Sequence, residues 1–177
     1  MLKNRILLLF VGLICFFAAC KNDPPYDLAA QAVIDDQLIT KYIADSGLTM
    51  EKGVKGLYYH IEDQGTGIQP GAADSVTLRY VGKLVSTGVV FDSTAVTIDS
   101  LLTRFPLTSV IEGWQLGVPL IREGGKIHLI VPSGLAYQNR AVGTILGSSP
   151  ATPVPANSNL DFEIKLISVT RDTTNHQ

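Results

Sequence analysis

The residue types most often used for metal binding and nucleophilic catalysis are few in this chain, with three histidines and two cysteines. The three histidines, His60, His128 and His176, do not fall into the HxxxH or HExxH spacings that place two metal ligands on one helix face. The sequence has no GxSxG nucleophile motif, no GxxxxGKS/T or GxGxxG phosphate loop, and no two carboxylates placed together by a motif. We therefore expect no metal site, no cofactor and no conventional catalytic triad, and we interpret the glycines at 124–125 and Ser133 as turn residues.

Both cysteines belong to an N-terminal segment with the features of an export signal. Its basic start is followed by an apolar stretch from Ile6 to Phe17, which is shorter than the roughly 20 residues that span a bilayer. The FAAC that ends it resembles a bacterial lipobox, which implies that residues 1–19 are removed and that Cys20 carries a lipid anchor in the membrane. The residue after Cys20 is Lys21 and not Asp. By resemblance to sorted lipoproteins, this implies the outer membrane of a Gram-negative cell, with the protein facing the periplasm or the cell surface. A plain secretory signal and a short uncleaved anchor are the alternatives.

The composition limits the remaining classes of function. The chain has 177 residues, of which 46% are hydrophobic and 17% are charged, with a formal charge of −2. This length and apolar content suit one domain with its own core. The near-neutral charge offers no cluster of Lys and Arg to displace counterions from phosphates, so we expect no nucleic-acid partner.

An amphipathic helix is predicted shortly after the signal. Asp27 can cap its N-terminus, and the pair at 46–47, Ser-Gly, can end it. Between them apolar residues follow a three-to-four spacing, at Leu28, Ile34, Leu38, Ile39, Tyr42 and Ile43. This apolar stripe must pack either against the following domain or against the same helix of a second copy, which would give a homodimer through residues 28–45.

Beyond Gly53 the hydrophobic period changes to two, which predicts strands. The segments concerned are 56–61, 75–81, 126–131 and 160–166. In the last of them Phe162 and the apolar residues that alternate with it share one face, while Asp161, Glu163 and Lys165 are expected on a water-exposed face. One short helix, from Glu112 to Gly117, interrupts the strands. The predicted fold class is α+β, an antiparallel sheet folded over one short helix and preceded by the amphipathic helix.

Four successive blocks of the sequence resemble, in order, the FKBP-type peptidyl-prolyl cis-trans isomerases. They are YVGKLVSTGVVFDST (80–94), FPLTSVIEGWQLGV (105–118), GGKIHLIVPSGLAY (124–137) and VPANSNLDFEIKLISV (154–169). The ordered set, with FD followed by VIxGW and then LAY, is far more specific than any one block. The resemblance implies a half-open antiparallel sheet wrapped around the short helix, with an apolar pocket between helix and sheet that holds a substrate prolyl ring.

The resemblance also assigns roles to residues at matching positions. Trp114 would form the pocket floor, and Asp92 the polar group beside it. The Ile111 N–H and the Tyr137 hydroxyl would donate hydrogen bonds to substrate carbonyls. The expected walls, rim and further substrate contacts are Tyr80, Phe91, Phe105, Phe162, Val110, Val154 and Ala136. The alternative for each apolar residue is plain core packing, above all for Phe162 in the strictly alternating strand.

For function, the resemblance implies an exported, lipid-anchored prolyl isomerase of the cell envelope that acts on proline-containing polypeptides and binds an FKBP-class macrolide. The alternative is a non-catalytic, chaperone-like module that binds proline-containing or unfolded segments. Residues 20–54 would form the tether and helix, 55–170 the isomerase domain and 171–177 a polar tail. The stretches 95–104 and 139–155 are longer than in the common family pattern, and such a difference can reshape a pocket wall.

Overall fold

A computed structural model describes residues 26–94, 104–143 and 152–173. Its helices and strands are α1 (Leu28–Asp45), β1 (Glu51–Lys52), β2 (Tyr58–Asp63), β3 (Ser75–Leu84), β4 (Val90–Ser93), β5 (Arg104–Pro106), α2 (Glu112–Gly117), β6 (Lys126–Val131) and β7 (Leu160–Thr170). Both predicted helices and all four predicted strands are confirmed. The strands that the sequence pattern did not predict, β1, β4 and β5, have only 2 to 4 residues each, too few to show a period of two.

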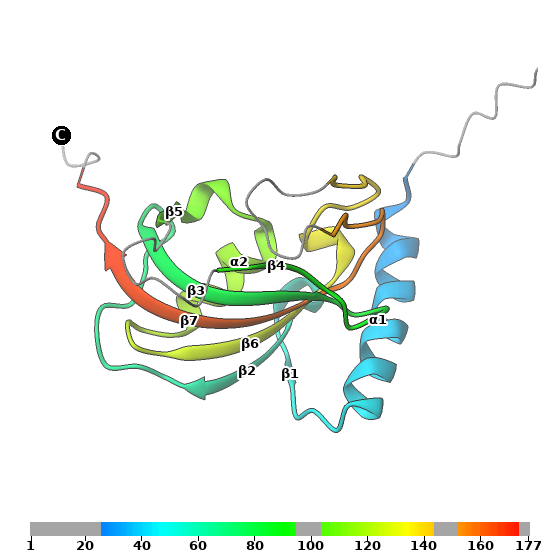
Figure 1. The fold of residues 1–177 in the computed structure, drawn as a ribbon, viewed down its shortest axis with the longest axis horizontal. Helices are drawn as coiled ribbons and strands as arrows, with labels where there is room; N and C mark the ends of the chain where they lie inside the picture. The colour runs from blue at the N-terminus through cyan, green and yellow to red at the C-terminus, as the bar shows by residue number, and fades with distance from the viewer. Residues whose placement is uncertain (1–25, 95–103, 144–151, 174–177) are drawn as a thin grey trace, which may run out of the picture.

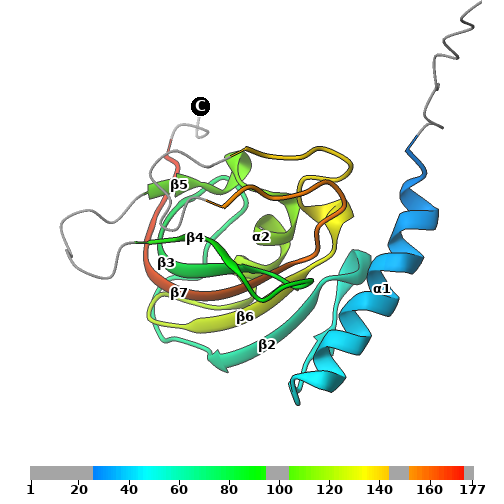
Figure 2. The same cartoon turned by 45° about the vertical axis from the view of Figure 1, so that its right-hand side comes forward.

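One antiparallel sheet contains all the strands, in the order β1-β2-β6-β7-β3-β4. β7 pairs with one edge of β3 over its whole length. The other edge of β3 is shared, since β5 pairs with its first residues and β4 pairs with residues further along. The sheet curves around α2 and remains open on one side (Figures 1 and 2). This is the half-open sheet around a short helix that the resemblance implies.

The core lies between α2 and the face of the sheet that curves around it. Leu78, Leu129 and Leu166 are fully buried there. Two glycines let α2 approach β6 closely, because a Cβ on Gly113 would lie 2.4 Å from Val131 Cγ1 and one on Gly117 would lie 2.6 Å from Leu129 Cδ1. The position of the short helix is therefore determined by direct contact of its backbone with the strand.

Helix α1 packs on the opposite face of the sheet, so the predicted packing on its own domain is what the structure shows. The Asp27 carboxylate accepts hydrogen bonds from the N–H groups of Ala29 and Ala30, as a cap should. Ile39 is fully buried and packs with Tyr58 of β2 and Ile130 of β6.

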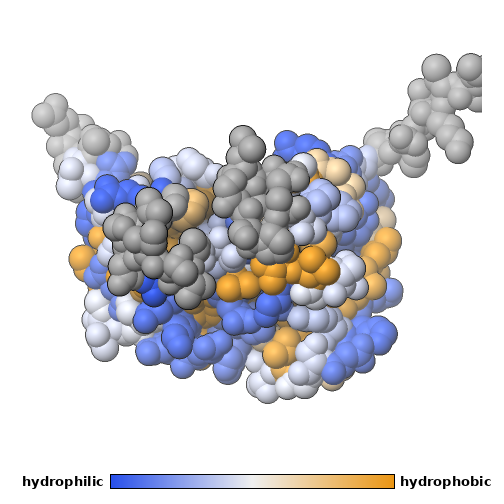
Figure 3. Space-filling view, viewed as in Figure 1, coloured by the Kyte–Doolittle hydropathy of each residue, from blue (hydrophilic) through white to orange (hydrophobic). Residues whose placement is uncertain are grey.

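The buried side of α1 differs from the predicted stripe. Leu28, Ile34 and Leu38 are about half exposed, and Figure 3 shows apolar surface along α1. Asp35 is buried instead, because its carboxylate accepts hydrogen bonds from the N–H (3.0 Å) and the hydroxyl (2.7 Å) of Ser133. Ser133 does lie in a turn, the 3-10 turn η5 (Ser133–Leu135), and it also anchors the helix.

The prediction that Asp161 faces water is wrong, because α1 covers that part of the sheet. Tyr42 Oη donates a hydrogen bond to Asp161 Oδ2 (2.6 Å), and His128 Nε2 lies 2.6 Å from Oδ1. Burial opposes the charge on Asp161, but hydrogen bonds from His128 and Tyr42 outweigh it and lower the pKa of the carboxyl group. Burial also opposes a charged His128, yet the hydrogen bond to Asp161 and the charges of Asp161, Glu163 and Glu62 raise the pKa of the ring. These two groups form an ion pair beneath α1 when His128 is protonated.

Neither α1 nor any other helix among the described residues combines the length and the hydropathy needed to cross a membrane. Cys20 and the rest of the predicted signal lie outside the described residues.

Candidate active site

Five aromatic rings from five different elements meet between α2 and the sheet. Trp114 of α2 lies at the centre, with ring centroids 4.8 Å from Tyr80 and 5.1 Å from Phe162. Phe105 of β5 completes one side at 6.0 Å from Trp114, and Phe91 of β4 packs behind Phe162 at 5.7 Å. All these pairs meet edge to face, the geometry in which a positive ring edge points at a negative ring face. The structure thus brings together rings that are up to 82 positions apart in the chain.

Burial divides the five rings into a floor and a rim. Phe91, Phe162 and Trp114 are buried, and the indole has 5% exposure. Tyr80 and Phe105 are only partly buried, as are Val110 and Ile111 before α2. A ligand at this cluster would therefore contact Tyr80, Phe105 and the residues ahead of α2 first, with the edge of Trp114 beneath them.

Gly82 makes the floor possible, and the sequence analysis did not single it out. A Cβ there would lie 2.7 Å from a carbon of the Phe162 ring and 2.9 Å from Phe91 Cζ. Gly113 and Gly117 have the same role beneath the indole, where they let α2 lie directly on β6. The available signal was a glycine within a strand pattern and two glycines around the Trp of a short helix, which often indicate a close approach of backbone to side chains.

A pair of phenols and one carboxylate form the polar side of the cluster. Tyr80 Oη donates a hydrogen bond to Asp92 Oδ2 at 2.7 Å. Burial, and then this hydrogen bond, raise the pKa of Tyr80. Burial also raises the pKa of Tyr137, and the negative charge of Asp92 adds to the effect. Both hydroxyls keep their protons at neutral pH, and the Tyr80 proton is donated to Asp92.

The start of α2 presents backbone rather than side-chain groups. Ile111 is the N-cap residue, and its carbonyl accepts hydrogen bonds from the N–H of Trp114 (3.0 Å) and of Gln115 (3.2 Å). The Ile111 N–H makes no hydrogen bond to another described residue. Gln115 Nε2 donates to the Val110 carbonyl at 2.8 Å, which holds the two residues before the helix in place.

Two other predicted contact residues, Ala136 and Val154, pack in or against the core that contains Trp114. Ala136 is partly buried and packs on the core. Val154 is fully buried in that core, and its N–H and carbonyl both pair with Val142 at 2.9 Å. Val154 is therefore a core residue. The two stretches that are longer than in the family pattern, 95–104 and 139–155, fall partly outside the described residues, at 95–103 and 144–151.

The arrangement suits binding of an apolar group beside protonated hydroxyls, and it offers no acid–base pair or nucleophile. Among residues 26–94, 104–143 and 152–173, no three His, Cys, Asp or Glu side chains are grouped so that they could hold a metal ion.

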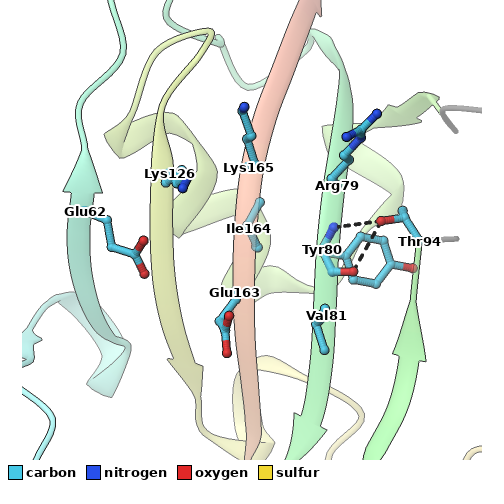
Figure 4. Close-up of a pocket in the computed structure, with 9 residues that line it drawn as sticks. All are labelled: Glu62, Arg79, Tyr80, Val81, Thr94, Lys126, Glu163, Ile164 and Lys165. Carbon is cyan, nitrogen blue, oxygen red and sulfur yellow. Dashed lines mark hydrogen bonds between the residues drawn. The ribbon is translucent and has the colours of Figure 1, made fainter. Parts of the chain in front are cut away.

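A shallow cavity of about 230 Å³ lies on the sheet face that is turned away from α2 (Figure 4). Charges of both signs line it, with Glu62 and Glu163 next to Arg79, Lys126 and Lys165. Figure 4 also shows Thr94, whose hydroxyl accepts a hydrogen bond from the Tyr80 N–H (3.0 Å) and holds the end of β4 against β3. This charged hollow shares Tyr80 with the aromatic cluster but lies on the other face of the sheet.

Comparison with known proteins assigns the fold and the cluster to a family. The sequence profile of the family described as FKBP-type peptidyl-prolyl cis-trans isomerase matches residues 66–167. The chain belongs to this family. The FKBP-type region so matched contains every residue that the resemblance places in the pocket, from Tyr80 to Phe162.

Individual relatives agree with the FKBP assignment. The chain is 35% identical over 147 residues to a probable FKBP-type peptidyl-prolyl cis-trans isomerase FkpA of Neisseria meningitidis, covering 74% of this chain and 50% of the relative. It is 40% identical over 114 residues to the outer membrane protein MIP of Legionella longbeachae, covering 64% and 44%. The chain thus spans about half the length, or less, of the curated FKBP relatives it matches.

Two solved structures resemble most of this chain. FkpA from Escherichia coli matches with a TM-score of 0.61 at 30% identity, covering 80% of this chain and 60% of that one. A peptidyl-prolyl cis-trans isomerase from Pseudomonas syringae pv. tomato matches with the same TM-score of 0.61 at 27% identity, covering 84% and 99%.

Proposed function

We propose that this protein is a peptidyl-prolyl cis-trans isomerase that accelerates rotation about Xaa-Pro bonds in polypeptides. The observation that carries the proposal is the cluster of five rings around Trp114, in a chain of the FKBP family, with protonated hydroxyls and a backbone N–H at its rim. We further propose that Trp114 forms the floor on which the prolyl ring lies, and that Tyr80, Phe91, Phe105 and Phe162 enclose it.

The chemistry requires no acid, base or nucleophile. Rotation about the Xaa-Pro bond must break amide resonance, a barrier of roughly 18–20 kcal/mol, and it takes tens to hundreds of seconds without a catalyst. The twisted amide has lost its charge-separated resonance form, so it is less polar than either planar ground state. A site that removes water from the amide therefore favours the twisted form, and each ~1.4 kcal/mol of that preference gives a tenfold increase in rate.

Hydrogen-bonding groups at the rim of the cluster would direct the twist. The Ile111 N–H and the Tyr137 hydroxyl would donate hydrogen bonds to substrate carbonyls, and Val110 would precede them at the rim. Asp92 accepts the Tyr80 hydrogen bond, so it orients that ring edge-on to the indole. Ala136 and Val154 would shape the wall behind Tyr137.

We also propose that the protein acts in the cell envelope of a Gram-negative bacterium, held by lipid on Cys20. The basic start, apolar stretch and FAAC of the first 20 residues support export and lipidation. The relative from Legionella longbeachae is named an outer membrane protein, which agrees with an envelope location for this chain as well. Its substrates would then be exported proteins whose folding is limited by proline isomerisation.

A protease-coupled assay on a proline peptide, together with refolding of a proline-limited protein, tests the activity. We expect acceleration by the full chain at catalytic concentration and at least a tenfold loss of kcat/KM in Trp114→Phe, which keeps a ring in the core. Far-UV circular dichroism checks that the variant is folded. Peptide binding without any acceleration would refute the isomerase and identify a binding module instead.

A further inference from the structure

A second hollow, of about 860 Å³, lies between α1 and the body of the domain. One wall is α1, and the other is formed by the turn η1 (Val54–Gly56), the first residue of α2 and the segment through η5. Its apolar lining consists of Leu28, Ala29, Ala32, Val33, Ile39, Pro132 and Leu135. Its volume is within the range of ligand-binding pockets. We refer to it as the α1 groove.

Two short segments of the chain border both the α1 groove and the aromatic cluster. Glu112 lines the groove and directly follows Ile111 at the rim of the cluster. Leu135 and Gln138 line the groove on either side of Ala136 and Tyr137, which pack against the core that contains Trp114. A polypeptide bound at the cluster would reach the groove by passing one of these two segments.

The charged residues at the groove are already paired. Lys55 Nζ lies 2.5 Å from Glu112 Oε1, and Lys52 forms an ion pair with Asp36. Asp35 accepts two hydrogen bonds from Ser133 and one from Gln31. Two ion pairs thus offset each other's charge, and the Asp35 carboxylate is buried and occupied by hydrogen bonds from neutral groups. The groove therefore presents mainly apolar side chains and favours a neutral, apolar occupant.

The groove is also preformed, since buried contacts hold α1 in place on both sides of it. Ser133 N–H lies 3.0 Å from Asp35 and 2.9 Å from Asn159 Oδ1, and all three residues are buried. Ile39 is buried against Tyr58 and Ile130 further along the helix. A binding surface that is fixed in advance loses less entropy when a ligand binds.

We propose that the α1 groove is a second substrate subsite, which binds apolar residues that flank the proline in an extended polypeptide. The proposal rests on the prolyl isomerase function proposed above, because the segment in the groove belongs to the chain whose proline lies on Trp114. Val33 and Ala29 of α1 then determine preference for the sequence around the proline, at a distance from the rotating bond.

Two peptides with the same central Xaa-Pro pair test this subsite with the full chain. One carries Leu and Val on both sides of the pair, and the other carries Ser and Gly over the same length. We expect kcat/KM to be about tenfold higher for the apolar peptide, the effect of burying roughly one aliphatic side chain. Equal kcat/KM for both peptides, with both isomerised, would overturn the subsite and leave the proposed function intact.

Matched variants on α1 decide whether the groove causes the preference. Val33→Glu changes a groove residue that is 60% exposed, and Ile34→Glu changes its neighbour outside the groove, which is 49% exposed. We expect the apolar-to-polar ratio to fall to about one in Val33→Glu and in Ala29→Glu, and to persist in Ile34→Glu. An equal loss in Ile34→Glu would overturn the proposal in favour of a second copy of α1 as the occupant, which sedimentation would show as a dimer.

Fluorescence anisotropy of the labelled peptides gives the same comparison without turnover. If the apolar peptide binds more tightly and Val33→Glu abolishes this difference, the result supports the groove. The same result without isomerisation of any peptide would refute only the isomerase function. Binding of both peptides with equal affinity to the unsubstituted chain overturns the groove.

Discussion

Gly113→Ala tests whether the contact of α2 with β6 positions the indole for function. An alanine Cβ would lie 2.4 Å from Val131 Cγ1 and 2.9 Å from Cγ2. Reaching an ordinary contact of 3.4 Å requires α2 and β6 to separate by about 1 Å, in a core that resists expansion. Overpacking costs about 1–3 kcal/mol, and the better helix propensity of Ala returns about 1 kcal/mol. We expect the free energy of unfolding, measured with urea, to fall by up to about 2 kcal/mol.

The effect on activity should be larger than the effect on stability. Trp114 follows directly after the substituted residue and Ile111 precedes it by two positions, so both move with α2. A displacement of about 1 Å in a site can cost about a hundredfold in rate. We therefore expect kcat/KM on a short proline peptide to fall by roughly tenfold to a hundredfold.

Val131→Ala supplies the matched rescue, because it removes the two Cγ atoms that the new Cβ would meet. The Gly113→Ala/Val131→Ala double variant should recover kcat/KM to within about threefold of Val131→Ala alone, a coupling expected of residues in contact. Gly143→Ala, where a Cβ meets no described residue within 4 Å, is the control. Full activity of Gly113→Ala, or no recovery in the double variant, would refute the reasoning.

Four further outcomes are expected. Tyr80→Phe removes the 2.7 Å hydrogen bond to Asp92 and should lower the free energy of unfolding by about 1.5–3 kcal/mol, measured by urea titration against Tyr59→Phe at an exposed phenol as control. The raised pKa of His128 stabilises the fold below its ordinary 6.5, so stability should fall as pH rises through the folded-state value; His128→Gln should flatten that limb in urea titrations across pH. The lowered pKa of Asp161 gives stability that is present above its ordinary 3.8 and lost as pH falls further, a second limb that Asp161→Asn should remove. An FKBP-class macrolide should raise the melting temperature of the full chain and not that of Trp114→Ala, and an unchanged melting temperature of the full chain would count against an intact pocket.

The sequence predicted the elements whose signals are local. The cap at Asp27, the stop after Asp45 and the alternation through Phe162 are properties of a few neighbouring residues, and the structure has them where the pattern placed them. The ordered blocks also predicted that Tyr80, Phe105 and Trp114 would meet, although nothing in their spacing alone required it.

What the sequence could not predict depends on packing between distant segments. Asp161 looked like a water-facing strand residue, because the pattern of its own strand contains no information about α1. Asp35 sits in a helix of ordinary appearance, and its burial follows from a serine 98 positions away. Gly82 gave only the weak signal of a glycine in a strand, and its role becomes visible only when the two phenylalanine rings against it are placed.

The turn η5 links the two faces of the sheet in a way that neither face shows alone. Ser133, the first residue of the turn, donates a hydrogen bond to Asp35 of α1. Ala136 and Tyr137, which directly follow the turn, border the aromatic cluster. The carbonyl of Ser133 accepts hydrogen bonds from both Ala136 (3.0 Å) and Gln138 (2.9 Å), so the turn is a short rigid unit. A change in how α1 packs must therefore move the Tyr137 hydroxyl, and α1 belongs to the positioning of the site as well as to the attachment of the domain.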